Sequence, residues 1–224
     1  MSGPTDSRAN AEQDAHPGKA AVSASVHRIL AALPARRFPI SRRDVPPDGI
    51  YLLYEEGETV QIEDQEFDRI VGVGTHSGEG RLARRLGIHA SGDRRGSDLR
   101  LHLGSAFLAQ ANSADPRLRT WLGEKRTPMP DVEEAVSTLI RERFAVRCIP
   151  VSDRQERQEL EQALTALLAR NPVTPPSEGW LGRHAARREI RSSGLWNTQH
   201  FDAPQLNATQ IARITDLVAD APGV

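Results

Sequence analysis

Two short apolar runs joined by a polar stretch constrain the fold of this chain more than any other feature. The first covers residues 50–54 after the turn-forming segment 46–49, and the second covers residues 68–74, where three β-branched residues stand between glycines. Runs of this kind, bounded by Pro and Gly, are typical of β-strands. Because an apolar segment through Val60 and Ile62 lies between them, we expect an antiparallel hairpin or meander.

Helical spacing of apolar residues marks much of the remaining chain. The clearest case is residues 154–169, where one apolar stripe runs along the segment until Asn171-Pro172 ends it. Residues 144–151 are apolar and β-like, which predicts a third strand. We therefore expect an α/β (α+β) fold, with a small antiparallel three-stranded sheet flanked by helices. The expected helices are 20–33, 81–89, 97–111, 132–143, 154–169 and 207–218.

Composition divides the chain into four parts. Residues 1–19 contain Pro, Gly, Ser, Asp and Asn without an apolar run, which is typical of a disordered tail. Residues 20–47 form an N-terminal helix and linker, residues 48–200 the main domain, and residues 201–224 a C-terminal helix and tail.

Several classes of protein are excluded by composition. No apolar run approaches the ~20 residues that a membrane-spanning helix needs. The N-terminus lacks the apolar segment of a signal peptide, and the single Cys148 stands in a β-like run, where we expect it to be buried. We expect a soluble, cytoplasmic protein without membrane contact.

Charge is segregated along the chain although the formal net charge is only −1. Acidic residues gather within 55–68, whereas basic residues gather in two other stretches. A phosphate-binding face requires such segregation, but two solvated helix faces would explain it equally well. The first basic stretch holds Arg81, Arg84, Arg85, Arg94, Arg95 and Arg100, and the second holds Arg183, His184, Arg187, Arg188 and Arg191.

Three motifs occur in a recognisable order. Gly49-Ile50-Tyr51 opens the first strand, Gly72-Val73-Gly74 closes the second, and Arg85 precedes His89 by four residues on the basic helix. This order resembles the GIY-YIG nuclease core, in which a later helix also carries a glutamate, here Glu161. The resemblance covers roughly residues 49–197. It implies a GIY-YIG-like nuclease domain within 48–200 and a metal-dependent endonuclease that hydrolyses phosphodiester bonds in DNA.

The resemblance implies a catalytic role for four residues. Glu161 would hold Mg²⁺ (or Mn²⁺), since Mg²⁺ takes one or two protein carboxylates and keeps several waters. Tyr51 would act as general base, and Arg85 would bind the phosphate through its forked donors. His89 would protonate the leaving oxygen or hold the phosphate. Residues expected to contact the nucleic acid are Arg81, Arg84, Arg95, Arg100 and His76.

The sequence departs from the family pattern at one half-motif, because Gly72 stands where the family usually has tyrosine. The terminal asparagine of the pattern is either Asn171 or Asn197. These features motivate an alternative: a catalytically inactive relative that binds nucleic acid or protein through the same face.

Each candidate also has a structural interpretation. Without the resemblance, Tyr51 is a core aromatic residue, Glu161 a solvated helix residue and Arg85 a surface arginine. His89 would satisfy a free carbonyl at a helix C-terminus. Trp180 and Trp196 are expected to anchor the C-terminal segment to the domain.

Overall fold

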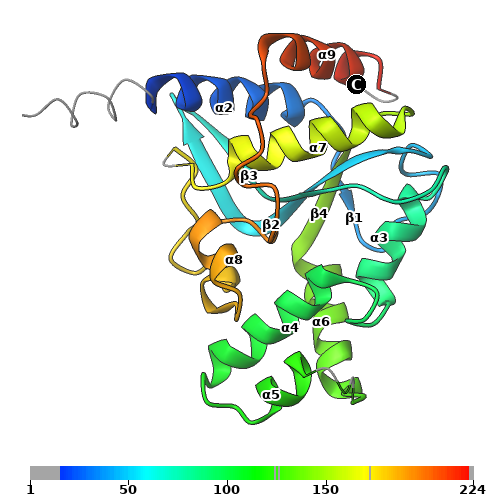
Figure 1. The fold of residues 1–224 in the computed structure, drawn as a ribbon, viewed down its shortest axis with the longest axis vertical. Helices are drawn as coiled ribbons and strands as arrows, with labels where there is room; N and C mark the ends of the chain where they lie inside the picture. Colours follow the sequence, from blue (N-terminus) through cyan, green and yellow to red (C-terminus); the bar gives the residue numbers. More distant parts are fainter. Residues whose placement is uncertain (1–15, 124, 126, 172, 222–224) are drawn as a thin grey trace, which may run out of the picture.

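A four-stranded antiparallel sheet forms the centre of the molecule (Figure 1). The computed structural model describes residues 16–123, 125, 127–171 and 173–221. The expected mixed fold with a small antiparallel sheet is confirmed, but the sheet has four strands rather than three. The additional strand is only two residues long and has no apolar pattern to reveal it. In sheet order the strands are β1 (Arg36–Arg37), β4 (Phe144–Pro150), β2 (Gly49–Ile62) and β3 (Gln65–Gly74).

The β2–β3 hairpin determines which residues face one another across the sheet. It turns at residues 63–64, where Glu63 has φ 53°. Tyr51 pairs with Gly74 and Leu53 with Gly72, and the register shifts between Leu53 and Tyr54. The hairpin therefore places Tyr51 directly opposite the last residue of β3.

Helices cover both faces of the sheet. Side chains alternate along a strand, so Tyr51 and Leu53 enter one core, whereas Ile50, Leu52 and Tyr54 enter the other. The second core is covered by α2 (His16–Ala31), α7 (Arg154–Leu168) and α9 (Ala208–Ala219), drawn above the sheet in Figure 1. The first core is covered by α3 (Leu82–Ser91), α4 (Asp98–Ala111), α5 (Arg117–Leu122), α6 (Pro130–Arg143), the 3-10 helix η1 (Leu181–His184) and α8 (Arg188–Ser193).

The termini differ in part from the expected division of the chain. Helix α2 begins at His16, so residues 16–19 of the expected tail are helical, and the rest of that tail lies outside the described residues. No helix in the described part of the chain is long and apolar enough to span a membrane.

The C-terminal segment is anchored along the outer edge of β3. Trp180 and Trp196 are buried and meet edge to face, with ring centroids 5.4 Å apart. The backbone N–H of Trp196 donates a hydrogen bond of 2.7 Å to the carbonyl of Val71. Both tryptophans are thus structural anchors, as expected, and they hold residues 196–200 beside the end of the hairpin.

Candidate functional site

The side chain of Tyr51 packs over a glycine of the neighbouring strand. Its side chain is 5 % exposed and lies across Gly74, its partner in the β2–β3 register. A Cβ atom added to Gly74 would stand 2.4 Å from the Tyr51 hydroxyl oxygen. The glycine that ends the second half-motif is therefore required by the packing of the tyrosine in the first.

Replacing Gly74 with alanine is expected to destabilise the protein by about 1–3 kcal/mol, because the added methyl group must displace the Tyr51 ring. Chemical denaturation measures this loss. Gly87→Ala is the control, since nothing lies within 4 Å of the Cβ it would add and alanine favours a helix interior. Equal stability of the two variants would contradict the packing described.

His89 points into the molecule from the last turn of α3. Its Nε2 lies 2.9 Å from the Tyr51 hydroxyl oxygen, and its Nδ1 lies 2.7 Å from Ser97 Oγ. Burial, followed by the charges of Arg85 and Arg100, lowers the pKa of His89 to about 3. A neutral imidazole with both nitrogens engaged is poorly suited to protonate a leaving oxygen.

Arg85 lies one turn before His89 and is partly buried. One of its terminal nitrogens donates a 3.0 Å hydrogen bond to the carbonyl of Gly96. Its buried Nε has no partner among the described residues. Burial raises the pKa of Tyr51, and the positive charge of Arg85 opposes that rise. Arg85 thus lies beside Tyr51, and its Nε–H donor is not used by any described residue.

One pocket of about 180 Å³ joins these three residues. Tyr51, Arg85 and His89 all line it, together with residues of the β3 end, the start of α4 and the C-terminal segment. The other lining residues are Leu53, Val73, Gly74, Thr75, Asp98, Leu99, Trp196, Asn197, Thr198, Gln199 and His200.

Glu161 comes from α7 and does not line this pocket. Burial is the main cause of the raised pKa of Tyr51, and the negative charge of Glu161 adds to that rise. Burial raises the pKa of Glu161 from 4.5 to about 7. Its carboxylate has no hydrogen bond or ion pair with any residue that the structure describes. Glu161 therefore presents a partly buried carboxylate without a protein partner.

The donor set fits one kind of metal site and excludes another. Within the described ranges, no three His, Cys, Asp or Glu side chains are grouped so as to hold a metal ion. A site built entirely from protein ligands, as for structural zinc, is therefore not formed by these residues. One open carboxylate fits Mg²⁺ or Mn²⁺, which can take the remaining ligands from phosphate and water.

Asn197 is the asparagine that lies at the pocket. Its Oδ1 accepts a hydrogen bond from the backbone N–H of Val73 (3.0 Å), and its Nδ2 donates one to the carbonyl of Val73 (2.8 Å). Its Oδ1 would also stand 3.6 Å from a Cβ on Gly72. Asn171 is instead buried, with its Oδ1 accepting from the N–H of Val173. The carboxamide of Asn197 therefore lies beside the position where the family tyrosine is missing.

The residues expected to contact nucleic acid lie in different environments. Arg81 and Arg84 are exposed on the α3 side and line a second pocket of about 210 Å³, which Arg85 shares. Arg95 is exposed and paired with Asp93. His76 is 7 % exposed, and its Nε2 accepts a 3.2 Å hydrogen bond from the N–H of Gly49. His76 thus supports the start of β2.

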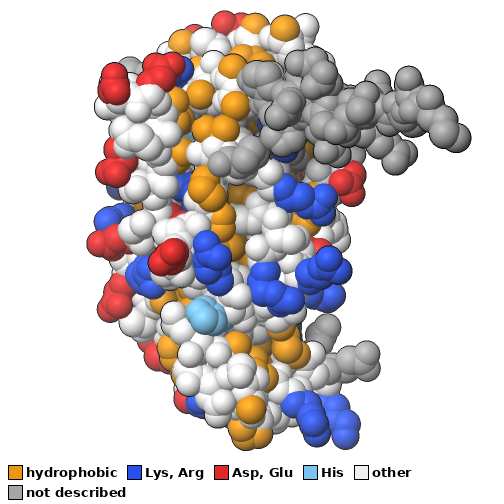
Figure 2. Space-filling view, turned by 90° about the vertical axis from the view of Figure 1, so that its left-hand side faces the viewer, with side chains coloured by type: hydrophobic (Ala, Val, Ile, Leu, Met, Phe, Trp, Pro, Cys, Tyr) orange, Lys and Arg blue, Asp and Glu red, His pale blue; other side chains and the backbone are white. Residues whose placement is uncertain are grey.

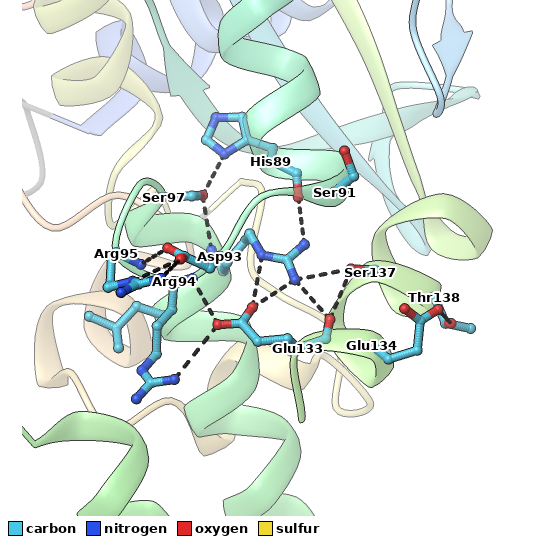
Figure 3. A network of polar contacts seen from close by, with 12 residues as sticks. His89, Ser91, Asp93, Arg94, Arg95, Ser97, Glu133, Glu134, Ser137 and Thr138 are labelled. Carbon is cyan, nitrogen blue, oxygen red and sulfur yellow. Dashed lines mark hydrogen bonds and ion pairs between the residues drawn. The ribbon is translucent and has the colours of Figure 1, made fainter. Parts of the chain in front are cut away.

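Arg100 lies in the interior, so a direct contact between its side chain and a phosphate is not available in this arrangement. Its guanidinium is fully buried and donates 2.8 Å to Glu133 Oε2 and 2.9 Å to the carbonyl of His89. Figure 3 shows Glu133 joined to the centre of this network, below His89 and Ser97. Arg100 connects α6 to the backbone of His89.

Three residues of the site were missed by the sequence analysis. Asp98 lines the pocket, while Ser97 and Glu133 support His89 and Arg100. A Ser-Asp pair before an apolar run is a typical helix start, which would have located Ser97 and Asp98 but not their neighbours in space.

A protein-family model described as GIY-YIG domain matches residues 35–222 of the chain. The chain belongs to the GIY-YIG family. The GIY-YIG match includes the sheet, α3, α7 and the C-terminal segment that lines the pocket, so the family resemblance is confirmed. GIY-YIG proteins are generally endonucleases and typically use divalent metal ions. No curated protein and no solved structure matches the chain.

Proposed function

We propose that this GIY-YIG protein is a metal-dependent endonuclease that hydrolyses phosphodiester bonds in DNA. The observation that carries the proposal is the convergence of Tyr51, Arg85 and His89 on one pocket. Glu161, which comes from α7, presents a partly buried carboxylate that no described residue pairs with, and its charge adds to the rise in the pKa of Tyr51. A phosphodiesterase site needs a base, a cation for the phosphate and a metal ligand. Tyr51 and Arg85 are the proposed base and cation in the pocket, and Glu161, outside its lining, is the proposed metal ligand.

Each group has a defined part in the reaction. Tyr51 first loses its hydroxyl proton to solvent, and its phenolate oxygen then takes a proton from the attacking water. The oxygen of that water forms a bond to phosphorus while the bond to the leaving oxygen breaks. Solvent returns a proton to the leaving oxygen. Arg85 donates hydrogen bonds to the phosphate. Glu161 would hold Mg²⁺ or Mn²⁺, which supplies positive charge for the phosphate and favours the ionised forms of nearby groups.

Two groups of exposed arginines support a nucleic-acid partner. Arg81 and Arg84 lie beside the pocket on the α3 side. A second group lies on and beside η1 and α8, whose chain continues into the pocket-lining segment 196–200. Figure 2, viewed from the side on which α8 lies, shows basic side chains gathered over the middle of that face. The exposed members of the second group are Arg183, Arg187, Arg188 and Arg191.

The test of this proposal is DNA cleavage by the wild-type protein and by Tyr51→Phe with Mg²⁺ or Mn²⁺. Loss of the hydroxyl is expected to lower the cleavage rate about 10²–10⁴-fold, because a general base contributes this much. Tyr54→Phe is the control, since Tyr54 is a buried tyrosine of the same strand that enters the other core. Equal cleavage by the wild type and Tyr51→Phe would refute the assignment of the base.

A second candidate is a GIY-YIG relative that binds nucleic acid or protein without cutting. It is favoured by Gly72, which stands in place of the second tyrosine with Asn197 beside it. Such a protein would bind DNA, cleave no substrate with any metal ion, and bind equally well after Glu161→Ala.

A further inference from the structure

A buried hydroxyl group connects His89 to the start of α4. Ser97 is 2 % exposed and is the N-cap residue of α4, with its Oγ accepting a 3.2 Å hydrogen bond from the backbone N–H of Arg100. The same oxygen lies 2.7 Å from His89 Nδ1 (Figure 3). Since Tyr51 lies at Nε2, the imidazole is held between two hydroxyl groups.

Hydrogen-bond accounting distinguishes the two neutral tautomers of His89. If Nδ1 carried the proton, Ser97 Oγ would accept from both Nδ1 and the N–H of Arg100. Its own O–H would then have no acceptor among the residues that the structure describes, and burial keeps it from water. A buried donor without a partner costs about 1–3 kcal/mol. If the proton is on Nε2, the Ser97 hydroxyl donates to Nδ1 and both groups are satisfied.

We propose that Ser97 is a positioning residue that keeps the proton of His89 on Nε2, so that His89 donates a hydrogen bond to the oxygen of Tyr51. The catalytic consequence rests on the function proposed above. In this arrangement His89 does not receive the proton of Tyr51. Tyr51, which lines the pocket, instead loses its hydroxyl proton to solvent and, as the phenolate, takes a proton from the attacking water.

With its proton on Nε2, His89 acts only as a hydrogen-bond donor to the oxygen of Tyr51. As Tyr51 takes up negative charge, its oxygen is stabilised by the Nε2–H donor on one side and by the charge of Arg85 on the other. After the proton of water has moved to Tyr51, His89 still carries its own proton on Nε2 and remains neutral throughout.

Arg100 and Glu133 also fix the positions of Ser97 and His89 through hydrogen bonds. Arg100 donates from its backbone to Ser97 and from its guanidinium to the carbonyl of His89, so one residue restrains both members of the hydrogen-bonded pair. Glu133 receives that guanidinium at 2.8 Å and 3.2 Å and thereby ties α6 to the pair. The position of the imidazole is thus determined jointly by α3, α4 and α6.

The direct test is long-range ¹H–¹⁵N NMR of the imidazole nitrogens in the wild-type protein at neutral pH. The expected spectrum has a protonated Nε2 and an unprotonated Nδ1 for His89, assigned with a His89→Gln sample. A proton on Nδ1 would overturn the proposal. Because this measurement needs no substrate, it can fail while cleavage is observed and succeed while cleavage is absent.

A pair of variants tests the consequence for catalysis. Ser97→Thr keeps a hydroxyl that can donate to Nδ1 of His89 and cap α4. Ser97→Ala loses both the hydrogen bond to His89 and the helix cap. We expect Ser97→Ala to lower kcat about 10- to 100-fold with little change in KM, and Ser97→Thr to retain most of the activity. Ser105→Ala, which removes another buried hydroxyl of α4, is the control for stability alone. Equal kcat for Ser97→Ala and Ser105→Ala would contradict the positioning role.

Discussion

Glu161→Gln is expected to remove metal-dependent cleavage and, at pH 8, to make the protein more stable. Glutamine is nearly the same size but carries no charge, so it is a poor ligand for Mg²⁺. A bound metal supplies several kcal/mol of transition-state stabilisation, and we therefore expect cleavage to fall roughly 10²–10³-fold.

The gain in stability follows from the burial of the carboxylate. Burial raises the pKa of Glu161 from 4.5 to about 7, so the folded protein binds this proton more tightly than the unfolded chain does. The associated stability is complete below pH 4.5 and is lost as the pH rises through about 7. Above that pH, the charged carboxylate costs roughly 1–3 kcal/mol in the free protein, and glutamine avoids this cost.

Thermal or urea unfolding of the wild type and Glu161→Gln at pH 5 and pH 8, without metal, measures the effect. The two proteins should be almost equally stable at pH 5, and the variant should be more stable at pH 8. Glu159→Gln, an exposed glutamate of the same helix, serves as control and should change neither value. A difference that does not depend on pH would contradict the environment assigned to Glu161.

Glu133→Ala is expected to destabilise the protein by about 3–5 kcal/mol. Arg100 is fully buried, and Glu133 is its carboxylate partner at 2.8 Å. Removing one member of a buried pair leaves the other charge uncompensated, which is more costly than losing the pair itself. Because Arg100 also holds the carbonyl of His89, cleavage should decline as well.

Glu134→Ala is the matched control for this prediction. Glu134 neighbours Glu133 on α6, but its partner Arg141 is exposed and the pair lies in solvent. An exposed ion pair contributes at most about 1 kcal/mol. Urea unfolding of both variants compares the two sites directly, and similar losses would show that the Arg100–Glu133 pair is not the support described.

The sequence predicted most of the fold because its patterns are local. The stripe of apolar residues and the terminating Asn171-Pro172 placed a helix at 154–169, and the structure has it at Arg154–Leu168. The glycine-rich second run likewise gave the strand that ends at Gly74. Strand β1 was not predicted, because Arg36–Arg37 has no alternating apolar pattern and forms a strand only by pairing with β4.

The site was predictable only as far as its motifs extend along the chain. Tyr51, Arg85 and His89 were chosen from the family order, and they line one pocket. Arg100 was expected to contact the nucleic acid, but it is buried against Glu133, which lies 33 residues away on another helix. No spacing rule connects such distant residues before the fold is known.

The distinction between Asn171 and Asn197 shows the same limit in physical terms. Asn171 is nearer to Glu161 in sequence, yet Asn197 reaches the pocket because the C-terminal segment returns along the edge of β3. That return depends on long-range contacts, such as the hydrogen bond from Trp196 to Val71, which the sequence does not reveal.

Metal-dependent endonuclease activity is measured by cleavage of supercoiled, linear and branched DNA by the wild type and Glu161→Gln. Each protein is incubated with Mg²⁺, with Mn²⁺ or with a chelator, and DNA binding is measured in parallel. We expect cutting that requires the metal ion and is lost in the variant while DNA binding persists. Absence of cutting in every wild-type reaction, or cutting that survives both the chelator and the substitution, would contradict it.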